Sequence, residues 1–403
     1  MAEEYYRLPR RVLAIALLLA FGIWLPLLVV PTIEDIITRQ LGISHALTAL
    51  LYSAPVAMLA LLAIPGGLLA DRIGIKKAVG IGTIFLSVGA VLRGMSTDFS
   101  TLLGFTILYG VGLGLCFPNL PKLARYCSPR ERANVTLGIF TVAIVFSGAL
   151  PLAITRPLIY PIAQSFQVVL LISALPAVAA AILWWLLVGD PPCESAGVET
   201  VGFDISALRK IVARADLWLA GLLFFLHNIV LYTWIGWVPQ FLTGIGASAD
   251  AAGLITSVVL WVGIPSVILL PRVSTRLGKR KPFLWGSSIL LVFASYGALF
   301  INLPLSWVLM FFTGIATTTR FVMLLALPVE MVTPEISGSA SGMVMSIGYV
   351  GALVGPLAGG FILDTTGSYH WIFISLAVVS VITAVIAFII PETGKKLAVK
   401  ITG

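Results

Sequence analysis

Two stretches of this sequence share one pattern: Gly67-Leu-Leu-Ala-Asp71-Arg72-Ile-Gly74-Ile-Lys76-Lys77 and Pro271-Arg-Val-Ser-Thr275-Arg276-Leu-Gly278-Lys-Arg280-Lys281. Each matched position in the second stretch is shifted by 204 residues, about half of the 403-residue chain. A segment that recurs at one fixed, long offset indicates a duplicated unit. The sequence therefore predicts two related halves that carry this segment in corresponding loops.

Long apolar runs surround both stretches, and they decide the class of the protein. Apolar residues make up 59% of the chain and charged residues only 10%, against roughly 45–50% and 25% in soluble domains. The mean hydropathy of +1.06 favours many membrane spans, each about 20 residues long. Twelve runs are long enough, at residues 12–31, 46–70, 78–95, 100–121, 134–157, 166–188, 217–242, 251–272, 283–301, 304–328, 338–363 and 370–390. We expect an all-α polytopic membrane protein with twelve transmembrane helices in two six-helix bundles, and we exclude a water-soluble globule.

Lysine and arginine lie almost entirely on one side of these runs. Of the 25 basic residues, 21 precede the first run or follow every second run. Cytoplasmic loops of membrane proteins carry such an excess, so we expect a multi-pass protein of the cell membrane with both termini in the cytoplasm. The first run follows a segment that contains acids, and we interpret it as a membrane helix and not as a secretory signal.

The longest polar stretch divides the chain into domains. Residues 1–188 form the predicted N-terminal six-helix bundle, residues 189–216 a cytoplasmic linker, and residues 217–403 the C-terminal six-helix bundle.

With these features the chain resembles the major facilitator superfamily over essentially its whole length. The first stretch has the leading glycine, the Asp71-Arg72 pair, the second glycine and the basic residues of that family's loop between helices 2 and 3. The second stretch departs from the pattern, with Pro271 for the leading glycine and Thr275 for the acid. The resemblance implies alternating-access transport without a cofactor, by two bundles that rock around a midplane site. It also implies that helices 1, 4, 7 and 10 line this site.

A cytoplasmic gate is expected at the repeated loops. Asp71 lies where its helix leaves the membrane, so we expect it to pair with a cation such as Lys122 or Arg125. The resemblance implies that this pair closes the inner side. Arg276 lacks an adjacent acid and Glu330 an adjacent cation, so these two are expected to pair across helices. The alternative for all of them is contact with solvent and lipid headgroups. The predicted gating residues are Asp71, Arg72, Gly67, Gly74, Arg125, Arg276 and Glu330.

One arginine lies deep in a predicted span. Arg320 comes eight residues before Pro328 at the inner end of its helix, a depth of ~12 Å at about 1.5 Å per residue. An arginine at the centre of a span costs roughly 2.5–3.5 kcal/mol, so we expect it to face a cavity or a partner. Thr313 and Thr317 share its helical face. The alternative is a structural role, in which the guanidinium reaches toward the surface or binds helix-end carbonyls.

Helix 7 carries a second deep candidate. His227 lies ten residues into the run 217–242, next to Asn228. Its imidazole could bind substrate or carry a proton, because histidine titrates near neutrality; the alternative is a buried core residue. The opposite wall would come from the first and fourth runs. The predicted substrate-binding residues are Arg320, His227, Asn228, Thr317, Thr313, Tyr109, Asn119 and Trp24.

We expect structural roles for two further arginines and for two groups of glycines. Arg93 and Arg156 lie near outer helix ends, where we expect them to snorkel to the interface; an entry-path role is the alternative. Two groups of glycines predict close helix contact: Gly110, Gly112 and Gly114 in the fourth run, and Gly351, Gly355 and Gly359, four residues apart, in the eleventh. They do not form a phosphate-binding loop, because the chain contains no G-x-x-x-x-G-K-[ST] sequence.

A deep cation without a deep carboxylate favours an anionic substrate. We therefore expect a secondary active transporter of a small anion, an organic monocarboxylate or a small inorganic anion, working by proton symport or anion exchange. The alternative within transport is efflux of a hydrophobic or drug-like compound. A membrane-embedded enzyme is a distant alternative, because the spans lack a nucleophile with its base and a metal triad. We expect no enzyme activity, metal or cofactor. The expected partners are the anion, membrane lipids and, in the case of symport, protons, with no nucleic acid and a monomeric protein.

Overall fold

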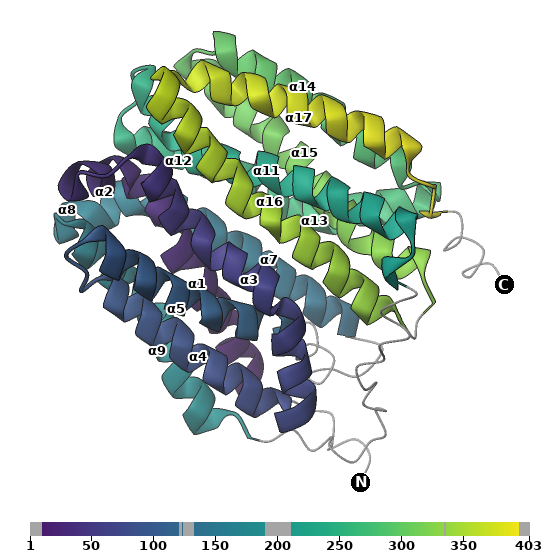
Figure 1. The fold of residues 1–403 in the computed structure, drawn as a ribbon, viewed down its shortest axis with the longest axis horizontal. Helices are drawn as coiled ribbons and strands as arrows, with labels where there is room; N and C mark the ends of the chain where they lie inside the picture. The colour runs from purple at the N-terminus through teal and green to yellow at the C-terminus, as the bar shows by residue number, and fades with distance from the viewer. Residues whose placement is uncertain (1–9, 121–122, 124–132, 190–210, 334–335, 395–403) are drawn as a thin grey trace. The chain divides into compact units, whose positions relative to one another are not determined.

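The computed structural model describes residues 10–120, 123, 133–189, 211–333 and 336–394. Over these residues the chain folds into helices, twelve of which are long and apolar enough to cross a membrane (Figure 1). This confirms the predicted all-α fold with twelve transmembrane helices. The protein is a multi-pass membrane protein.

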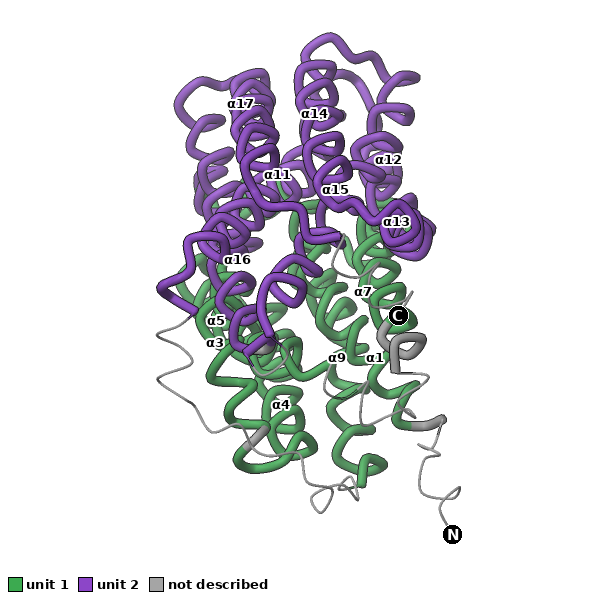
Figure 2. Tube along the Cα trace, turned by 90° about the vertical axis from the view of Figure 1, so that its right-hand side faces the viewer, with its two compact units in different colours: residues 1–43, 54–203 green, residues 44–53, 204–403 purple. Residues whose placement is uncertain are grey.

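The helices gather into two compact units, which Figure 2 draws in different colours. Unit 1 consists of residues 1–43 and 54–203, and unit 2 of residues 44–53 and 204–403. Residues 44–53 therefore cluster with unit 2, although the rest of the helix that they begin belongs to unit 1. Most of the predicted linker, 189–216, lies outside the described residues.

Unit 1 is built from the first half of the chain. Its elements are α1 (Arg10–Leu28), the 3-10 helix η2 (Val30–Ile33), α2 (Glu34–Leu41), α3 (His45–Ile73), α4 (Ile75–Arg93), α5 (Phe99–Cys116), the 3-10 helix η3 (Phe117–Asn119), α7 (Ala133–Ile154), the π-helix η4 (Thr155–Ile159), α8 (Tyr160–Ala163) and α9 (Phe166–Leu187). The Asp98 side chain accepts a hydrogen bond from Thr101 N (3.0 Å) at the start of α5. Such a cap satisfies a backbone N–H group that the first helical turn leaves unpaired, and it fixes where α5 begins.

Glycines bring α4 and α5 into backbone contact. A Cβ atom on Gly89 would lie 2.4 Å from Tyr109 N, and one on Gly112 would lie 2.3 Å from Leu86 N. Larger residues would prevent this approach. The close contact predicted for the glycines of the fourth span is therefore present, and it fixes Tyr109 inside the unit.

Unit 2 is built mostly from the second half. Its elements are α11 (Ala215–Gly244), α12 (Ala249–Trp261), α13 (Gly263–Leu277), α14 (Lys281–Gly297), the 3-10 helix η6 (Ala298–Phe300), α15 (Leu303–Met331), α16 (Ser337–Thr366) and α17 (Tyr369–Ile389). Side chains again set helix starts: Ser248 caps α12 and Asn302 caps α15.

The contact between α11 and α16 also depends on glycine. A Cβ atom on Gly351 would lie 2.1 Å from Phe225 O, and one on Gly355 would lie 2.6 Å from Ile229 O. The glycine spacing predicted this close approach. Further along α11, the Phe241 ring packs on Phe373 of α17 with 4.6 Å between ring centroids. These contacts hold α11 firmly on two sides.

The start of α3 is anchored by a side chain of α16. Asp364 accepts hydrogen bonds from His45 N and Ala46 N, both at 2.9 Å. A carboxylate at a helix N-terminus satisfies unpaired N–H groups and complements the helix dipole. This anchor explains why residues 44–53 cluster with unit 2.

Candidate functional site

Two deep side chains predicted from the sequence, Arg320 and His227, contact each other in unit 2. Arg320 on α15 is 1% exposed and His227 on α11 is 0% exposed. Arg320 Nε donates a hydrogen bond to His227 Nδ1 at 3.0 Å, and Arg320 Nη1 lies 3.5 Å from Ser288 Oγ of α14. The guanidinium is thus held by side chains from two other helices and does not snorkel to a membrane surface.

Two nitrogen atoms of this Arg320–His227 pair lack a hydrogen-bond partner among the described residues. They are Arg320 Nη2 and His227 Nε2. Because Nδ1 accepts a bond, the proton of the neutral imidazole is on Nε2. Both unpartnered nitrogens are therefore donors, and each buried unsatisfied donor costs roughly 1–3 kcal/mol. A ligand that brings acceptor atoms would remove this cost.

Aromatic rings surround the pair. Phe224 stacks on His227, with ring centroids 6.0 Å apart and an interplanar angle of 7°. The ring of Phe321 lies 5.9 Å from the imidazole, and Tyr349 packs on Phe224 at 5.5 Å. An apolar surrounding lowers the local dielectric constant and strengthens the attraction of a single positive charge for an anion.

The two threonines expected beside Arg320 are buried on the same helix. Thr317 Oγ1 donates to the Thr313 carbonyl at 2.8 Å, so its proton is used within α15. Among the described residues, Thr313 Oγ1 has no hydrogen-bond partner. Of the two predicted hydroxyl groups, that of Thr313 is therefore the one still available to a ligand.

Both asparagines of the predicted site bind helix carbonyls. Asn228 Nδ2 donates to Phe224 O and to Gly348 O, each at 3.1 Å, which joins α11 to α16. In unit 1, Asn119 Nδ2 donates to Gly66 O at 3.1 Å and to Leu115 O of α5 at 2.9 Å. Their N–H groups are committed to packing, so neither has a donor left for an anion.

The aromatic candidates of unit 1 are also largely engaged. The Tyr109 hydroxyl donates to Ile23 O of α1, and its ring lies under Arg93 with 5.2 Å from the guanidinium carbon to the centroid. Trp24 packs edge-on against Phe117 at 5.8 Å. Among the described residues, Trp24 Nε1 has no hydrogen-bond partner. Trp24 is thus the candidate of unit 1 that keeps a free donor.

Arg93 differs from the expectation that it snorkels. It is 1% exposed, and its Nη1 donates to Pro26 O at 2.8 Å. Pro26 lies in the last turn of α1, where carbonyls lack a partner within the helix. The guanidinium therefore turns inward to cap α1. The position of Arg93 in the sequence did not predict this contact, because the sequence does not show where α1 ends.

Arg156 also has protein partners. Its Nε donates to Thr32 O at 2.6 Å, and its guanidinium forms an ion pair with Asp35. Asp35 pairs in addition with Arg39 at 2.5 Å. The π-helix that contains Arg156 follows α7 directly. A network within unit 1 thus replaces the expected contact of Arg156 with the interface.

A second buried ion pair lies at the inner end of α15 and corrects one expected contact. Glu330 pairs with Arg280, not with Arg276, at 2.8 Å between Arg280 Nη2 and Glu330 Oε1. Gly278 ends α13 in the left-handed conformation, with φ 61°. This turn brings Arg280 toward Glu330, while Arg276, in the last turn of α13, is exposed.

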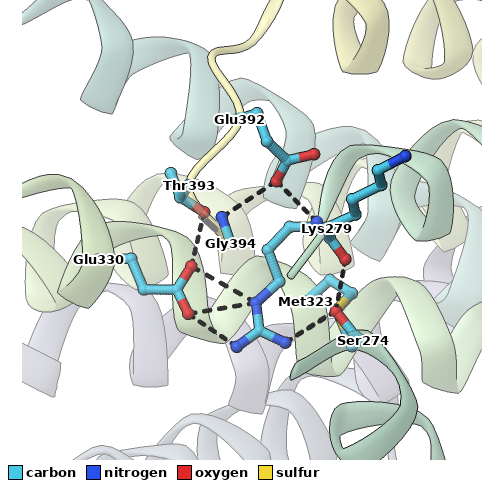
Figure 3. A network of polar contacts seen from close by, with 8 residues as sticks. Ser274, Lys279, Met323, Glu330, Glu392, Thr393 and Gly394 are labelled. Carbon is cyan, nitrogen blue, oxygen red and sulfur yellow. Dashed lines mark hydrogen bonds and ion pairs between the residues drawn. The ribbon is translucent and has the colours of Figure 1, made fainter. Parts of the chain in front are cut away.

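The segment after α17 completes this cluster (Figure 3). Thr393 Oγ1 donates to Glu330 Oε2 at 2.5 Å. The Glu392 carboxylate accepts from Arg280 N (2.7 Å), Lys281 N (3.2 Å) and Gly394 N (3.0 Å). Partial burial raises the pKa of Glu392, but these backbone N–H groups outweigh it and hold the pKa below its usual value.

Arg280, Glu392 and Thr393 are not among the gating residues predicted from the sequence. The run Pro391-Glu392-Thr393-Gly394 could have indicated Glu392 and Thr393, because it is polar and turn-forming and directly follows the last apolar run. We refer to Arg280, Glu330, Glu392 and Thr393 as the inner charge cluster.

The other predicted gating residues lie at the first copy of the repeat. Gly74 has φ 87° between α3 and α4, so both copies of the repeat place a positive-φ glycine after a helix, where other residues are strained. Gly67 lies within α3, and Arg72 is exposed at its end. The side chain of Asp71 and all of Lys122 and Arg125 lie outside the described residues. The gating roles of all six remain predictions.

Comparison with known proteins gives a consistent result. A family model described as the Major Facilitator Superfamily matches residues 12–251 and 238–402. The cyanate transport protein CynX of Escherichia coli (strain K12) is 27% identical over 350 residues, 86% of this chain and 89% of that protein. The hexuronate transporter of Bacillus subtilis (strain 168) is 25% identical over 396 residues, 91% of this chain and 90% of that protein.

A solved structure shares the fold. The bacterial homolog of the human lysosomal transporter Spinster, in an inward-facing and unoccupied conformation, superimposes with a TM-score of 0.77 at 17% identity. The match covers 97% of this chain and 98% of the other.

Proposed function

The chain belongs to the major facilitator superfamily, and from this premise we propose that it is a secondary transporter of a small anion, with Arg320 as the charge partner of the substrate. The observation that carries the proposal is the pair of unpartnered, buried donors on Arg320 and His227. Donors without acceptors favour a ligand rich in acceptor atoms, and the guanidinium charge favours a negative one.

The names of the similar proteins support this substrate class. Cyanate and hexuronate, the substrates in the names of two relatives, are both anions. Other relatives are named for tartrate and for galactarate or D-glucarate, which carry two carboxylates, so the names support an anion and the charge number rests on the site. A single guanidinium at the centre of the proposed site matches one negative charge. We therefore favour an organic monocarboxylate or a small inorganic anion over a polyvalent one.

We place the protein in the cell membrane with both termini in the cytoplasm, on the distribution of its basic residues. In this proposal Asp71, Arg72 and the inner charge cluster govern closure of the cytoplasmic side. The working unit is one chain surrounded by lipid. Transport proceeds by alternating access, by proton symport or by anion exchange.

Uptake into proteoliposomes tests the proposal. The panel compares formate, acetate and cyanate with neutral amphiphiles, using wild type, Arg320→Ala and Arg272→Ala. Arg272 is an exposed arginine of α13 and serves as the matched control. We expect uptake of at least one anion that is lost in Arg320→Ala and retained in Arg272→Ala. Uptake of neutral amphiphiles alone, unchanged in Arg320→Ala, would contradict the proposal and favour hydrophobic efflux.

A further inference from the structure

We infer that His227 stays neutral during transport and contacts the anion as a hydrogen-bond donor through Nε2. In this arrangement Arg320 and His227 form one binding unit with a single positive charge and two donors. The inference rests on the proposed anion transport and deepens it. It assigns a second substrate contact, and it excludes His227 as the proton carrier of a symporter.

The direction of one hydrogen bond indicates that His227 is neutral. Arg320 Nε always carries its proton and can only donate, and it lies 3.0 Å from His227 Nδ1. His227 Nδ1 must therefore offer its lone pair. A protonated imidazole carries protons on both nitrogens, so an N–H group would then face an N–H group, and two cations would be in contact. Protonation of His227 requires this pair to break.

The surroundings of the imidazole also disfavour a second positive charge. Its own helix α11 contributes Phe224, and α15 contributes Phe321 and the charge of Arg320. From α16, the phenol of Tyr349 packs on Phe224. Among the described residues, no carboxylate forms a salt bridge with His227, and Nε2 has no hydrogen-bond partner. Within the described part of the chain, no neighbouring charge therefore compensates a second cation beside Arg320, whereas an anion at Nε2 compensates the one already present.

The packing around His227 fixes the direction of its Nε2–H group. Asn228, the next residue, ties α11 to α16 through Gly348 O at 3.1 Å. Phe224 lies one turn earlier and stacks on the imidazole with its ring nearly parallel. Arg320 holds the opposite ring nitrogen. The imidazole is thus fixed on three sides, and Nε2–H is the group left to meet a ligand.

Nitrogen-15 NMR tests the tautomer without any substrate. The chain contains three histidines, so selectively labelled protein gives few imidazole signals, and His227→Gln identifies those of His227. We expect His227 to show one protonated nitrogen, Nε2, from about pH 6 to 8. Protonation of both nitrogens in this range, or a proton on Nδ1, would overturn the inference.

Calorimetry tests the contact and the proton together. Binding of cyanate, formate and acetate to purified protein is measured in buffers with different heats of ionisation, which reports the protons taken up per anion. We expect no proton uptake linked to His227. An uptake of about one proton per anion that disappears in His227→Gln, but persists in His370→Gln, would overturn the inference while leaving anion transport intact. His370 is the exposed control histidine.

Two variants separate the roles of the two ring nitrogens. In His227→Asn the amide oxygen can take the place of Nδ1 and accept from Arg320, but no donor replaces Nε2. In His227→Gln the longer side chain places an amide N–H near the Nε2 position. We expect affinity to fall about tenfold or more in His227→Asn, and less in His227→Gln.

The outcomes distinguish the two proposals. Wild-type affinity in His227→Asn would show that Nε2 does not contact the anion, and it would leave Arg320 as the charge partner. Failure of every anion to bind wild type would contradict the proposed function, whatever tautomer the NMR spectrum shows.

Discussion

Arg280 and Glu330 form a buried ion pair, with 2.8 Å between Arg280 Nη2 and Glu330 Oε1 and side chains only 7% and 6% exposed. Ser274 Oγ receives a further N–H of the guanidinium at 2.8 Å, and Thr393 donates to the carboxylate. Both charges therefore have hydrogen-bond partners in addition to each other. A buried pair of this kind contributes most visibly when one partner is removed, because the other charge then remains desolvated and unpaired.

Glu330→Gln should destabilise the protein by about 3 kcal/mol, because it leaves the Arg280 charge buried without an anion. The thermal unfolding of purified protein in detergent measures this loss. Arg276→Ala is the control, since Arg276 lies on the adjacent turn but is exposed. Equal losses in the two variants would show that the buried Arg280–Glu330 pair contributes no more to stability than an exposed charge does.

Glu392→Gln should lower stability at neutral pH, by less than Glu330→Gln, and the difference should depend on pH. The backbone N–H groups of Arg280, Lys281 and Gly394 hold the native pKa of Glu392 below its usual value of 4.5. The stability from this carboxylate is therefore present above the usual pKa and is lost as pH falls through the lowered native pKa. Unfolding temperatures of wild type and Glu392→Gln should therefore converge as pH falls below 4.5 and through the lowered native pKa. A difference that stays constant over the whole acid range would argue against the role of the charge.

Much of the fold could be predicted because it depends on one-dimensional properties of the sequence. Run length and apolar content determine the twelve spans, and the depth of Arg320 and His227 follows from counting along them. Their contact could not be predicted, because it depends on how α11 and α15 are rotated and packed against each other. The position of α11 depends in turn on its contact with α16, where Gly351 lies against Phe225 O.

Side chains near helix ends were the hardest to predict. Arg276 and Arg280 are four residues apart, and only the left-handed turn at Gly278 decides which of them reaches Glu330. Asn228 looked like a site residue because it is polar and deep, yet its N–H groups bind carbonyls of two helices. Polarity and depth identify residues that need a partner, but tertiary packing determines whether the protein already supplies one.

Gly351→Ala should destabilise the contact between α11 and α16 by about 1–3 kcal/mol, the cost typical of overpacking. The new Cβ atom would lie 2.1 Å from Phe225 O, a backbone atom of α11 that cannot move without shifting the helix. Gly286→Ala on α14 is the matched control, because nothing lies within 4 Å of a Cβ atom there. Thermal unfolding of the two variants should therefore differ, with Gly286→Ala unchanged or slightly stabilised. An unchanged unfolding temperature in Gly351→Ala would mean that the helices separate here more easily than their geometry indicates.

Arg320→Lys should bind the substrate anion more weakly while retaining some transport. Lysine keeps the positive charge, but it lacks the planar fork in which Nε binds His227 Nδ1 while Nη2 is left for a ligand. The loss of a hydrogen bond to a charged group costs about 1.5–3 kcal/mol, which lowers affinity on the order of 10- to 100-fold. Arg93→Lys is the control: Arg93 is equally buried, but its guanidinium caps α1 through Pro26 O in unit 1. This control should affect thermal stability more than affinity. Binding of cyanate, formate and acetate to the purified variants measures affinity, and thermal unfolding measures stability. Wild-type affinity in Arg320→Lys would show that charge alone, without the guanidinium geometry, selects the anion.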